Sequence, residues 1–341
     1  MEDDRLEAYP TESWTDVLPD YFANSHPNSL NTSENRMSVP PLSGLLNIYK
    51  PAGWSSRDVV NRVERLVKPS KAGHAGTLDP LAEGVLIVAV GAATRLITGA
   101  QEREKEYHAV FQLGCRSDTD DSTGIITTVD VSQPPTRDTI EALIPQFLGE
   151  IWQVPPQYSA VHIDGERAYA LARQGQAVDI APRQVQVSRL EILNYAWPSL
   201  ELLIECGSGT YVRSIGRDLG ELLGCGALMS ALLRSRIGPF HSTEAVAIDD
   251  LQRDNIATHL QPPIRAVEHW PQHVCSALEL WDIAHGRMII LKQLAEGTRV
   301  ALLDPTGELA ALGEMRTLGR VRPTQVFVDR YRLTNPAATG L

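Results

Sequence analysis

An aspartate in a glycine-rich loop is the residue of this chain best suited to do chemistry. Asp79 lies in the stretch Gly73-His74-Ala75-Gly76-Thr77-Leu78-Asp79-Pro80, between a basic segment and an apolar run at 85–90. Glycines let a backbone approach a ligand closely, and loops of this kind present functional side chains. The residues alone leave a second interpretation open. In this second interpretation, Asp79 only caps a short turn over 80–83, because proline after aspartate is a common helix-start signal.

Basic residues are concentrated just before this loop. The net charge of the chain is −11, which argues against a nucleic-acid partner. However, residues 1–42 hold eight acidic and two basic residues and account for −6 of that charge. The basic group therefore has two interpretations, a solvated helix face or a local surface for nucleic acid. Its members are Arg57, Arg62, Arg65, Lys68, Lys71 and His74.

Apolar spacing predicts the elements that hold the loop in place. Val59, Val60 and Val63 recur at helical intervals after a capping serine, Ser55 or Ser56, and Pro69 ends that helix. Alternating apolar residues predict a strand over 105–114. Further strands are predicted over 45–49, 85–90, 185–195 and 200–206, and further helices over 136–149, near 166–174, around Ile215 and Leu219, and within 250–272 beside a proline-containing connector.

The predicted fold class is α+β with a small β-rich domain near the C-terminal end. Residues 1–42 lack apolar periodicity, which is typical of disorder. A change to short strands and turns after residue 272, with a hairpin turn at 304–307, indicates the small domain. The expected segments are a disordered acidic extension (1–42), a main domain (43–250) with a turn-rich insertion at about 115–185, a connector (251–272), the small β-rich domain (273–335) and a tail (336–341).

Several classes of protein and site are not expected. No apolar run approaches the roughly 18 residues of a membrane span, and the acidic start does not resemble a signal peptide, so we expect a cytoplasmic protein. The four cysteines are scattered and are expected to be free, buried thiols. The stretch 118–124 superficially resembles a calcium loop but lacks glycine at its sixth and glutamate at its twelfth position. We therefore expect no metal site.

The literal string from Gly73 to Leu86 resembles the catalytic-aspartate motif of the bacterial tRNA pseudouridine synthase B family. Other family motifs follow in the right order, and the resemblance covers about 44–330. It implies a pseudouridine-synthase catalytic domain over 43–250, with a large mixed or antiparallel sheet flanked by helices and an RNA-gripping insertion. It also implies a PUA-like, RNA-binding domain at 273–335. The other matching motifs are Lys50-Pro51-Ala52-Gly53, Lys105-Glu106-Tyr107, Gly209–Arg213 and Leu232–Phe240.

The resemblance implies a role for Asp79 as the catalytic nucleophile or base at the junction of sugar and uracil. Three actions stay open: attack on C1′, addition to C6, or removal of a ribose proton. The family pairs its aspartate with the arginine matched by Arg213, and an adjacent guanidinium keeps a carboxylate charged. Position alone would make Arg213 an exposed arginine at a helix start. Lys50 and Pro51 are expected to support the site.

Four further residues receive substrate-binding roles from the resemblance. Tyr107 is the stacking platform for the flipped uracil, and Leu232 lines the other side of the pocket. His74 fills the space that the flipped base leaves, and Tyr211 contacts the uracil edge. The pattern alone instead favours a core aromatic residue at Tyr107 and a surface histidine at His74.

The function implied is isomerisation of the T-loop uridine of tRNA, position 55, to pseudouridine. The reaction breaks the N1–C1′ bond and joins C5 to C1′ without a redox change, so no cofactor is expected. The expected partner is the tRNA T-arm stem-loop. No obligatory protein partner is expected, and a monomer is favoured. Two alternatives stay open: a guide-RNA-dependent pseudouridine synthase, and a non-catalytic tRNA-binding or tRNA-folding protein.

We expect residues 1–36 to be dispensable for activity. Met37 is followed by a short lead-in to the first strand, whereas the 36 residues before it carry a surplus of acid. Such a segment would repel phosphate and reduce non-specific RNA binding. Two explanations stay open, a regulatory tail or a start codon assigned too far upstream, and the intact mass of the natively expressed protein distinguishes them.

Overall fold

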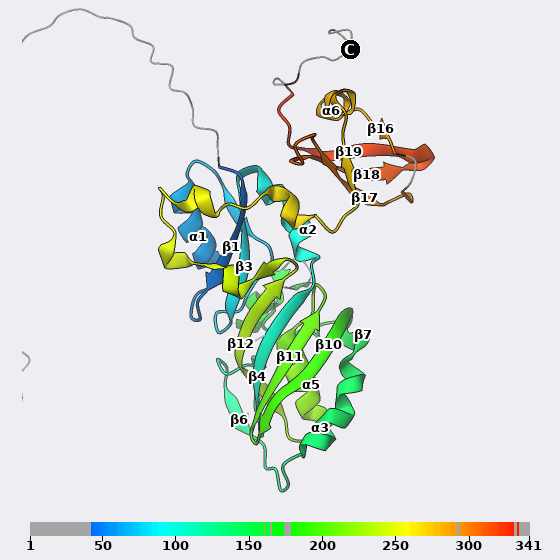
Figure 1. Ribbon diagram of the computed structural model, residues 1–341. Helices are drawn as coiled ribbons and strands as arrows, with labels where there is room; N and C mark the ends of the chain where they lie inside the picture. The colour runs from blue at the N-terminus through cyan, green and yellow to red at the C-terminus, as the bar shows by residue number, and fades with distance from the viewer. Residues whose placement is uncertain are drawn as a thin grey trace, which may run out of the picture. The chain divides into compact units, whose positions relative to one another are not determined.

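A mixed sheet organises the fold around the loop that carries Asp79 (Figure 1). The computed structural model describes residues 42–159, 161–163, 166–173, 179–291, 294–330 and 333. Within this part of the chain the sheet has ten strands in the order β14-β1-β3-β12-β4-β11-β10-β7, with β2 added to β3 and β13 to β12. The pairs β1–β14 and β3–β12 are parallel and the other pairs are antiparallel. The strands are β1 (Gly44–Lys50), β2 (Ala72–His74), β3 (Glu83–Val90), β4 (Lys105–Leu113), β7 (Gly149–Gln153), β10 (Arg183–Ala196), β11 (Ser199–Cys206), β12 (Ala227–Ile237), β13 (Phe240–His241) and β14 (Val246–Ala247).

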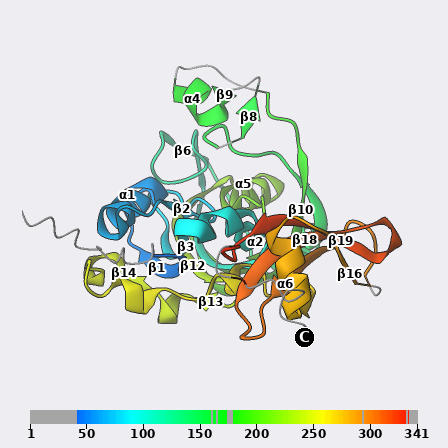
Figure 2. The same ribbon diagram turned by 90° about the horizontal axis from the view of Figure 1, so that it is seen from above.

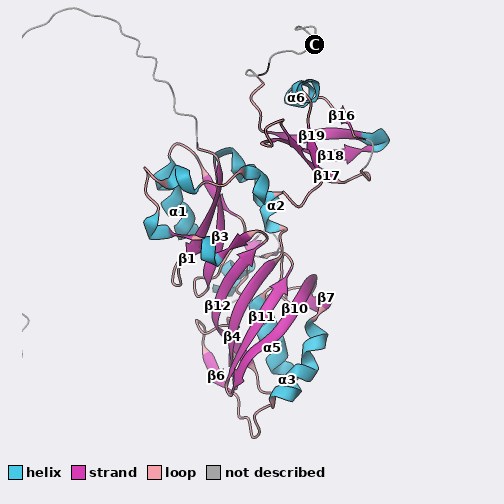
Figure 3. Cartoon of the chain, in the orientation of Figure 1, coloured by secondary structure: helices cyan, strands magenta, loops and turns pink. Residues whose placement is uncertain are grey.

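Helices flank the sheet, as the cartoon coloured by secondary structure shows (Figure 3). Helix α1 begins after Ser55, whose hydroxyl accepts from the Asp58 amide in a capping box, and it packs beside β2 and β3 (Figure 2). The α-helices are α1 (Ser56–Val67), α2 (Ile97–Gln101), α3 (Arg137–Leu143), α4 (Ala168–Arg173), α5 (Val212–Leu222) and α6 (Ala277–Ala284). Short 3₁₀ helices lie at Gly91–Leu96, Ile144–Phe147, Ser242–Glu244, Ile248–Asp250, Ile256–His259, Pro263–Ala266 and Thr317–Gly319.

Helix α5 lies very close to the centre of the sheet. A Cβ added to Gly216 would stand 2.1 Å from the ring of Phe111 on β4, so only glycine permits this approach. Ile215 and Leu219 of α5 join Phe111, Tyr107 and Leu232 in one buried cluster. The same cluster includes Leu78. Packing of α5 against β4 therefore brings the start of α5, where Arg213 lies, toward the loop of Asp79.

Strands β1 and β3 are covered on both faces. Val59, Val60 and Val63 of α1 pack on one face, and the 3₁₀ helix at Gly91–Leu96 together with α2 covers the other. Burial on both faces explains why β3 is a continuous apolar run rather than an alternating one.

A second sheet of five strands forms the small β-rich domain. Its order is β15-β17-β18-β19-β16, with β15 and β17 parallel. The hairpin predicted at 304–307 is confirmed, since Asp304 accepts from the amides of Thr306 and Glu308 in the turn between β17 and β18. Its strands are β15 (Gln272–Val274), β16 (Ile289–Ile290), β17 (Arg299–Leu303), β18 (Leu309–Arg316) and β19 (Arg320–Val326).

Two separate two-stranded ribbons lie in the segment expected to be turn-rich. They pair β5 (Cys115–Ser117) with β6 (Ile126–Thr128) and β8 (His162–Ile163) with β9 (Glu166–Arg167).

The predicted α+β class, with a large mixed sheet flanked by helices and a small β domain, is confirmed. One predicted element was wrong and two strands were missed. Residues 250–271 contain 3₁₀ helices and turns instead of an α-helix, because Pro262 and Pro263 interrupt the segment before an α-helix can extend. The central strand β12 was not predicted, and β7 lies in a segment expected to contain only turns and a short helix.

Some expectations concern residues that are not described, namely 1–41, the tail 336–341 and the end of the helix expected near 166–174. Across the described ranges, no helix is long and apolar enough to cross a membrane. The same ranges hold no cluster of three or more potential His, Cys, Asp or Glu metal ligands.

Candidate active site

The backbone on either side of Asp79 is held in place by hydrogen bonds. Ser56, at the first turn of α1, accepts from the Leu78 amide at 2.8 Å and donates to the Leu78 carbonyl at 3.1 Å. The Gly53 amide donates to the Pro80 carbonyl at 2.7 Å. The first turn of α1 thus holds Leu78, and the turn before α1 holds Pro80. Because both neighbours of Asp79 are held, the position of its carboxylate is fixed.

A buried arginine on β12 holds the other part of the loop. Arg234 is 2% exposed and donates to the carbonyls of Gly76, Thr77 and Val85 at 3.2, 3.4 and 2.8 Å. Its own carbonyl would lie 2.3 Å from a Cβ at Gly84, where φ is +101°, so glycine is required there. Arg234 therefore acts as a structural clamp, with three donors satisfied by backbone oxygens.

Asp79 forms an ion pair with Arg213, and its carboxylate does not cap a helix. Arg213 Nε lies 2.9 Å from Asp79 Oδ2, and Pro80 and Leu81 form only a turn, closed by the Ala82 amide that donates to the Asp79 carbonyl. Arg213 is 5% exposed, so its interpretation as an exposed helix-start arginine is wrong. Its Nη1 and Nη2 donate to the carbonyls of Thr119 and Tyr158 at 2.8 and 3.0 Å. The guanidinium is thus held from three directions.

Asp121 is a member of the site that the sequence did not indicate. Its Oδ2 lies 3.7 Å from Arg213 Nη1, while its Oδ1 accepts from the amide of Thr123 and from the hydroxyls of Thr119 and Thr123. The segment was interpreted as a polar turn because its ion-pair partner is distant in the chain. No local spacing rule reports such a contact.

Burial raises the pKa of the Asp79 carboxyl above its usual value, and the charge of Asp121 acts in the same direction. Arg213 and Lys50 oppose this rise through their positive charges. Since a nucleophilic or basic role requires the ionised carboxylate, the rate is expected to increase as the pH rises through this raised pKa.

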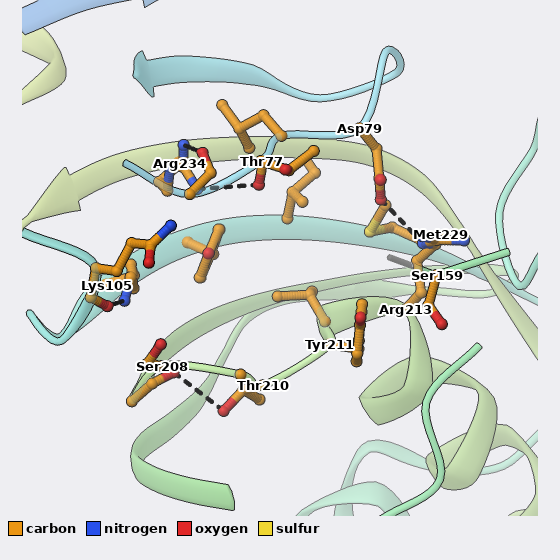
Figure 4. A pocket seen from close by; sticks show the side chains of 18 of the residues that line it. Thr77, Asp79, Lys105, Ser159, Ser208, Thr210, Tyr211, Arg213, Met229 and Arg234 are labelled. Atoms are coloured by element: carbon orange, nitrogen blue, oxygen red, sulfur yellow. Dashed lines mark hydrogen bonds and ion pairs between the residues drawn. The ribbon is translucent and has the colours of Figure 1, made fainter. Parts of the chain in front are cut away.

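A cavity of about 560 Å³ opens beside this ion pair (Figure 4). Tyr107 of β4 and Leu232 of β12 line it and are 8% and 7% exposed, so each lies in the core and also forms the cavity wall. Burial raises the pKa of Tyr107, which keeps its phenol neutral. The structure therefore brings Asp79, Tyr107, Arg213 and Leu232 together.

Tyr211 also lines this cavity, at the residue that precedes α5. Its amide donates to Gln153 Oε1 at 2.7 Å, and its carbonyl accepts from Gln153 Nε2 at 3.0 Å. The guanidinium of Arg183 lies 4.6 Å from the centre of the Tyr211 ring. Gln153, on the unpredicted strand β7, thus positions the start of α5.

A second cavity of about 540 Å³ shares Asp79 and Arg213 with the first. His74 and Arg57 line this second cavity but not the first, whereas Tyr107 and Leu232 line only the first. His74 Nδ1 is buried and lacks a hydrogen-bond partner in the described chain. Burial and the charge of Arg234 lower the pKa of His74, which favours the neutral imidazole.

Lys50 and Pro51 line neither cavity and support the active-site loop from outside it. Lys50 is fully buried, and its Nζ donates to the carbonyls of Pro51 and Trp54 at 2.8 and 2.6 Å. These bonds close the turn whose Gly53 amide holds Pro80. Burial, followed by the charge of Arg234, lowers the pKa of Lys50 to about 8.

The variant Asp121→Asn is expected to react about tenfold more slowly, because Arg213 then has one charged neighbour fewer to hold it. The acid limb of its pH–rate profile is expected to move to lower pH, since Asp121 contributes to the raised pKa of Asp79. Single-turnover rates measured across the acid range check both effects. An unchanged rate and profile would show that Asp121 only supports its own turn.

Comparison with known proteins gives consistent results. Residues 64–212 match the family described as TruB family pseudouridylate synthase (N terminal domain), and residues 213–269 match the tRNA pseudouridylate synthase B C-terminal domain. A relative named tRNA pseudouridine synthase B from Dehalococcoides mccartyi is 40% identical over 292 residues, which cover 84% of this chain and 97% of the relative. One of the same name from Syntrophomonas wolfei is 40% identical over 298 residues, covering 84% of this chain and 99% of the relative.

Solved structures resemble the fold as well. A chain of a Cbf5-Nop10-Gar1 complex has a TM-score of 0.68 and 27% identity, covering 86% of this chain and 87% of that one. A chain of an H/ACA RNP bound to a substrate RNA containing 2′-deoxyuridine has a TM-score of 0.66 and 25% identity, covering 87% and 93%.

Proposed function

Because the chain belongs to the TruB family of pseudouridylate synthases, we propose that it isomerises the T-loop uridine of tRNA, position 55, to pseudouridine. The buried Asp79–Arg213 pair at the edge of an aromatic-walled cavity carries this proposal. An ionised carboxylate held by a guanidinium provides the nucleophile or base that the sugar–base junction requires.

The cavity suits a uracil that has left its stack. Extruding a base costs a few kcal/mol, and stacking on an aromatic ring recovers about 1–3 kcal/mol. Tyr107 is the stacking platform, Leu232 closes the opposite side, and Tyr211 contacts the uracil edge. His74, in the neighbouring cavity, fills the space that the base leaves in the RNA. The cavity that each residue lines supports this division, since Tyr107, Leu232 and Tyr211 line the first and His74 lines the second.

The partner is the T-arm stem-loop of tRNA, and the protein acts as a monomer in the cytoplasm without an obligatory protein partner. Residues 43–250 form the catalytic domain, with an RNA-gripping insertion at about 115–185. Residues 251–272 connect it to a PUA-like RNA-binding domain over 273–335. The separate five-stranded sheet supports the division between the main and the small domain.

Two other functions predict different results with purified protein. A guide-RNA-dependent synthase is favoured by the likeness to ribonucleoprotein chains, but the bacterial relatives are more similar, at 40% against 27% identity. A non-catalytic tRNA-binding protein would not need the Asp79–Arg213 pair.

Purified protein mixed with unmodified tRNA, and no other RNA, provides the test. Pseudouridine at position 55, mapped after the reaction, is the expected result. Binding without modification would favour the non-catalytic alternative. Modification only after a guide RNA is added would favour the guided one.

The basic face of α1 is expected to contact tRNA phosphates. Arg57, Arg65 and Lys68 are exposed, and no carboxylate in the described part of the chain lies within ion-pair distance of them. The two acids of α1 are engaged elsewhere: Asp58 in the capping box with Ser55, and Glu64 with the Ala72 amide at 3.4 Å.

Replacing Arg57, Arg65 and Lys68 together by glutamine should weaken tRNA affinity and make it less dependent on salt. The slope of log affinity against log salt concentration should become shallower by about 1 for each phosphate that is no longer neutralised. Binding curves between low and moderate salt measure both effects. The matched control is the single change Arg189→Gln, compared with Arg65→Gln, because Arg189 lies outside the proposed insertion and its charge is paired with Glu191 and Glu205. Equal effects of these two changes would show that only net charge matters.

A further inference from the structure

One buried cation in the larger cavity has no role in the chemistry of the Asp79–Arg213 pair. Lys105 is 6% exposed and begins β4, two residues before Tyr107. Alternate residues of a strand point to the same face, so the two side chains share one side of β4, about 7 Å apart along the strand. Figure 4 shows Lys105 and Asp79 at opposite ends of the cavity. A uracil stacked on Tyr107 with its ribose at Asp79 would direct its far edge toward Lys105.

The ammonium group of Lys105 lacks an ion-pair partner among the described residues. Its Nζ donates to the carbonyl of Gln101, which leaves two of its three N–H groups for other acceptors. The nearby Glu102 is engaged with Arg299 at 2.6 and 2.7 Å. Cys206 pairs with Lys105 across β11 and β4. Burial raises the pKa of the Cys206 thiol to about 11, so this thiol is neutral.

A second positive charge, that of Arg234, acts on Lys105. Arg234 faces it from β12, with its donors on the carbonyls of the Asp79 loop. Burial, followed by the charge of Arg234, lowers the pKa of Lys105 to about 8, so the amine still carries its proton at neutral pH. Glu102 favours the protonated amine but forms its ion pair with Arg299, and a buried cation without an ion-pair partner of its own is costly, which in a cavity is typical of a functional position.

We propose that Lys105 is a further catalytic residue, which donates a hydrogen bond to the uracil and stabilises the negative charge that the ring acquires during the reaction. This inference rests on the proposed pseudouridine synthase function. When the C1′–N1 bond breaks, N1 keeps the electron pair and the charge spreads to the two carbonyl oxygens. If Asp79 has attacked C1′, C5 then supplies the electron pair for the C1′–C5 bond while the bond from C1′ to the Asp79 oxygen breaks, after which C5 loses its proton and N1 gains one. If Asp79 removes a ribose proton, the uracil also leaves with the N1 electron pair, and if Asp79 adds to C6, charge develops on a ring carbonyl oxygen. All three routes therefore use Lys105 in the same way.

The test compares uracil and 5-fluorouracil as leaving groups, in the wild-type enzyme and in Lys105→Met. Single-turnover loss of the target nucleoside is measured with ordinary tRNA and with tRNA carrying 5-fluorouridine. The variant should react about ten- to a hundredfold more slowly with uridine, the range for removal of a charge-assisted hydrogen bond. The fluorine withdraws electrons and stabilises the uracil anion, so the deficit should shrink severalfold with 5-fluorouridine.

Two controls separate this role from others. Arg213→Lys acts at the ribose end, so its deficit should be similar for both nucleosides. Lys105→Arg keeps the charge and should retain more activity than Lys105→Met. If Lys105→Met does not fold, Lys105→Gln takes its place, since its amide can still donate to Gln101.

Three results would overturn the inference about Lys105. The first is an equal rate deficit of Lys105→Met with both nucleosides. The second is a loss of tRNA affinity with an unchanged rate, which would indicate a phosphate contact. The third is a lowered melting temperature with an unchanged rate at saturating tRNA. Wild-type enzyme that forms pseudouridine would still support the proposed function in each case. Wild-type enzyme that forms none would reject the proposed function itself.

Discussion

Replacing Asp79 by asparagine is expected to abolish pseudouridine formation while leaving tRNA affinity within about tenfold of the wild-type value. The substitution preserves the shape of the side chain, and the amide oxygen can still accept from Arg213 Nε, which lies 2.9 Å from the carboxylate in the wild-type protein. What disappears is the charge that makes the group a nucleophile or a base. Single-turnover assays with excess enzyme, together with binding measurements on the same tRNA, give the two quantities.

Asp138→Asn provides a matched control for Asp79→Asn. Asp138 lies exposed in the first turn of α3, within the proposed insertion, so a second control, Asp254→Asn in the connector, is made at an exposed aspartate outside it, and both changes should leave the rate at saturating enzyme unchanged. Appreciable turnover by Asp79→Asn would reject the catalytic assignment. A large loss of affinity would instead mean that the carboxylate chiefly positions RNA.

Arg213→Lys is expected to slow the reaction about a hundredfold or more, because small displacements of a reacting group cost rates of that order. Arg213 contacts Asp79, Thr119 and Tyr158 through three nitrogens of one planar fork, and a lysine amine cannot reach all three at these distances. Arg213 also opposes the rise in the pKa of Asp79. If the amine lies farther from the carboxylate, this pKa rises further, and the acid limb of the pH–rate profile moves to higher pH.

Arg217→Lys is the control for Arg213→Lys on the same helix. Arg217 is paired with Asp120 and Asp218 at 2.9 and 2.8 Å but lines neither cavity. We expect that change to affect the melting temperature more than the rate. A wild-type rate and pH profile in Arg213→Lys would show that the fork geometry has no part in catalysis.

The local order around the active-site loop could be predicted from the chain itself. Ser55 and the valines of α1 specify a capped amphipathic helix, and the apolar run of β3 specifies a buried strand, because capping and periodicity depend on neighbouring residues. The motif around Asp79 indicated the chemistry. The pairing of Asp79 with Arg213 was implied only by the resemblance to a family.

Long-range contacts decided the rest. β12 was not predicted because it lies between β3 and β4 at the centre of the sheet, where burial replaces the alternation that identifies a half-exposed strand. Gln153, which positions Tyr211, lies on β7, in a segment where the pattern indicated only turns and a short helix.

The components of the site illustrate the same division. The sequence determined which residue types were available: a carboxylate on a glycine-rich loop, an arginine at a helix start, and a tyrosine on an alternating strand. The tertiary structure decided that Asp121 contacts Arg213, that Arg234 holds the loop, and that Lys105 has no ion-pair partner among the described residues. The physical reason is that electrostatics and burial depend on distances between segments, and those distances are set only when the sheet and α5 pack together.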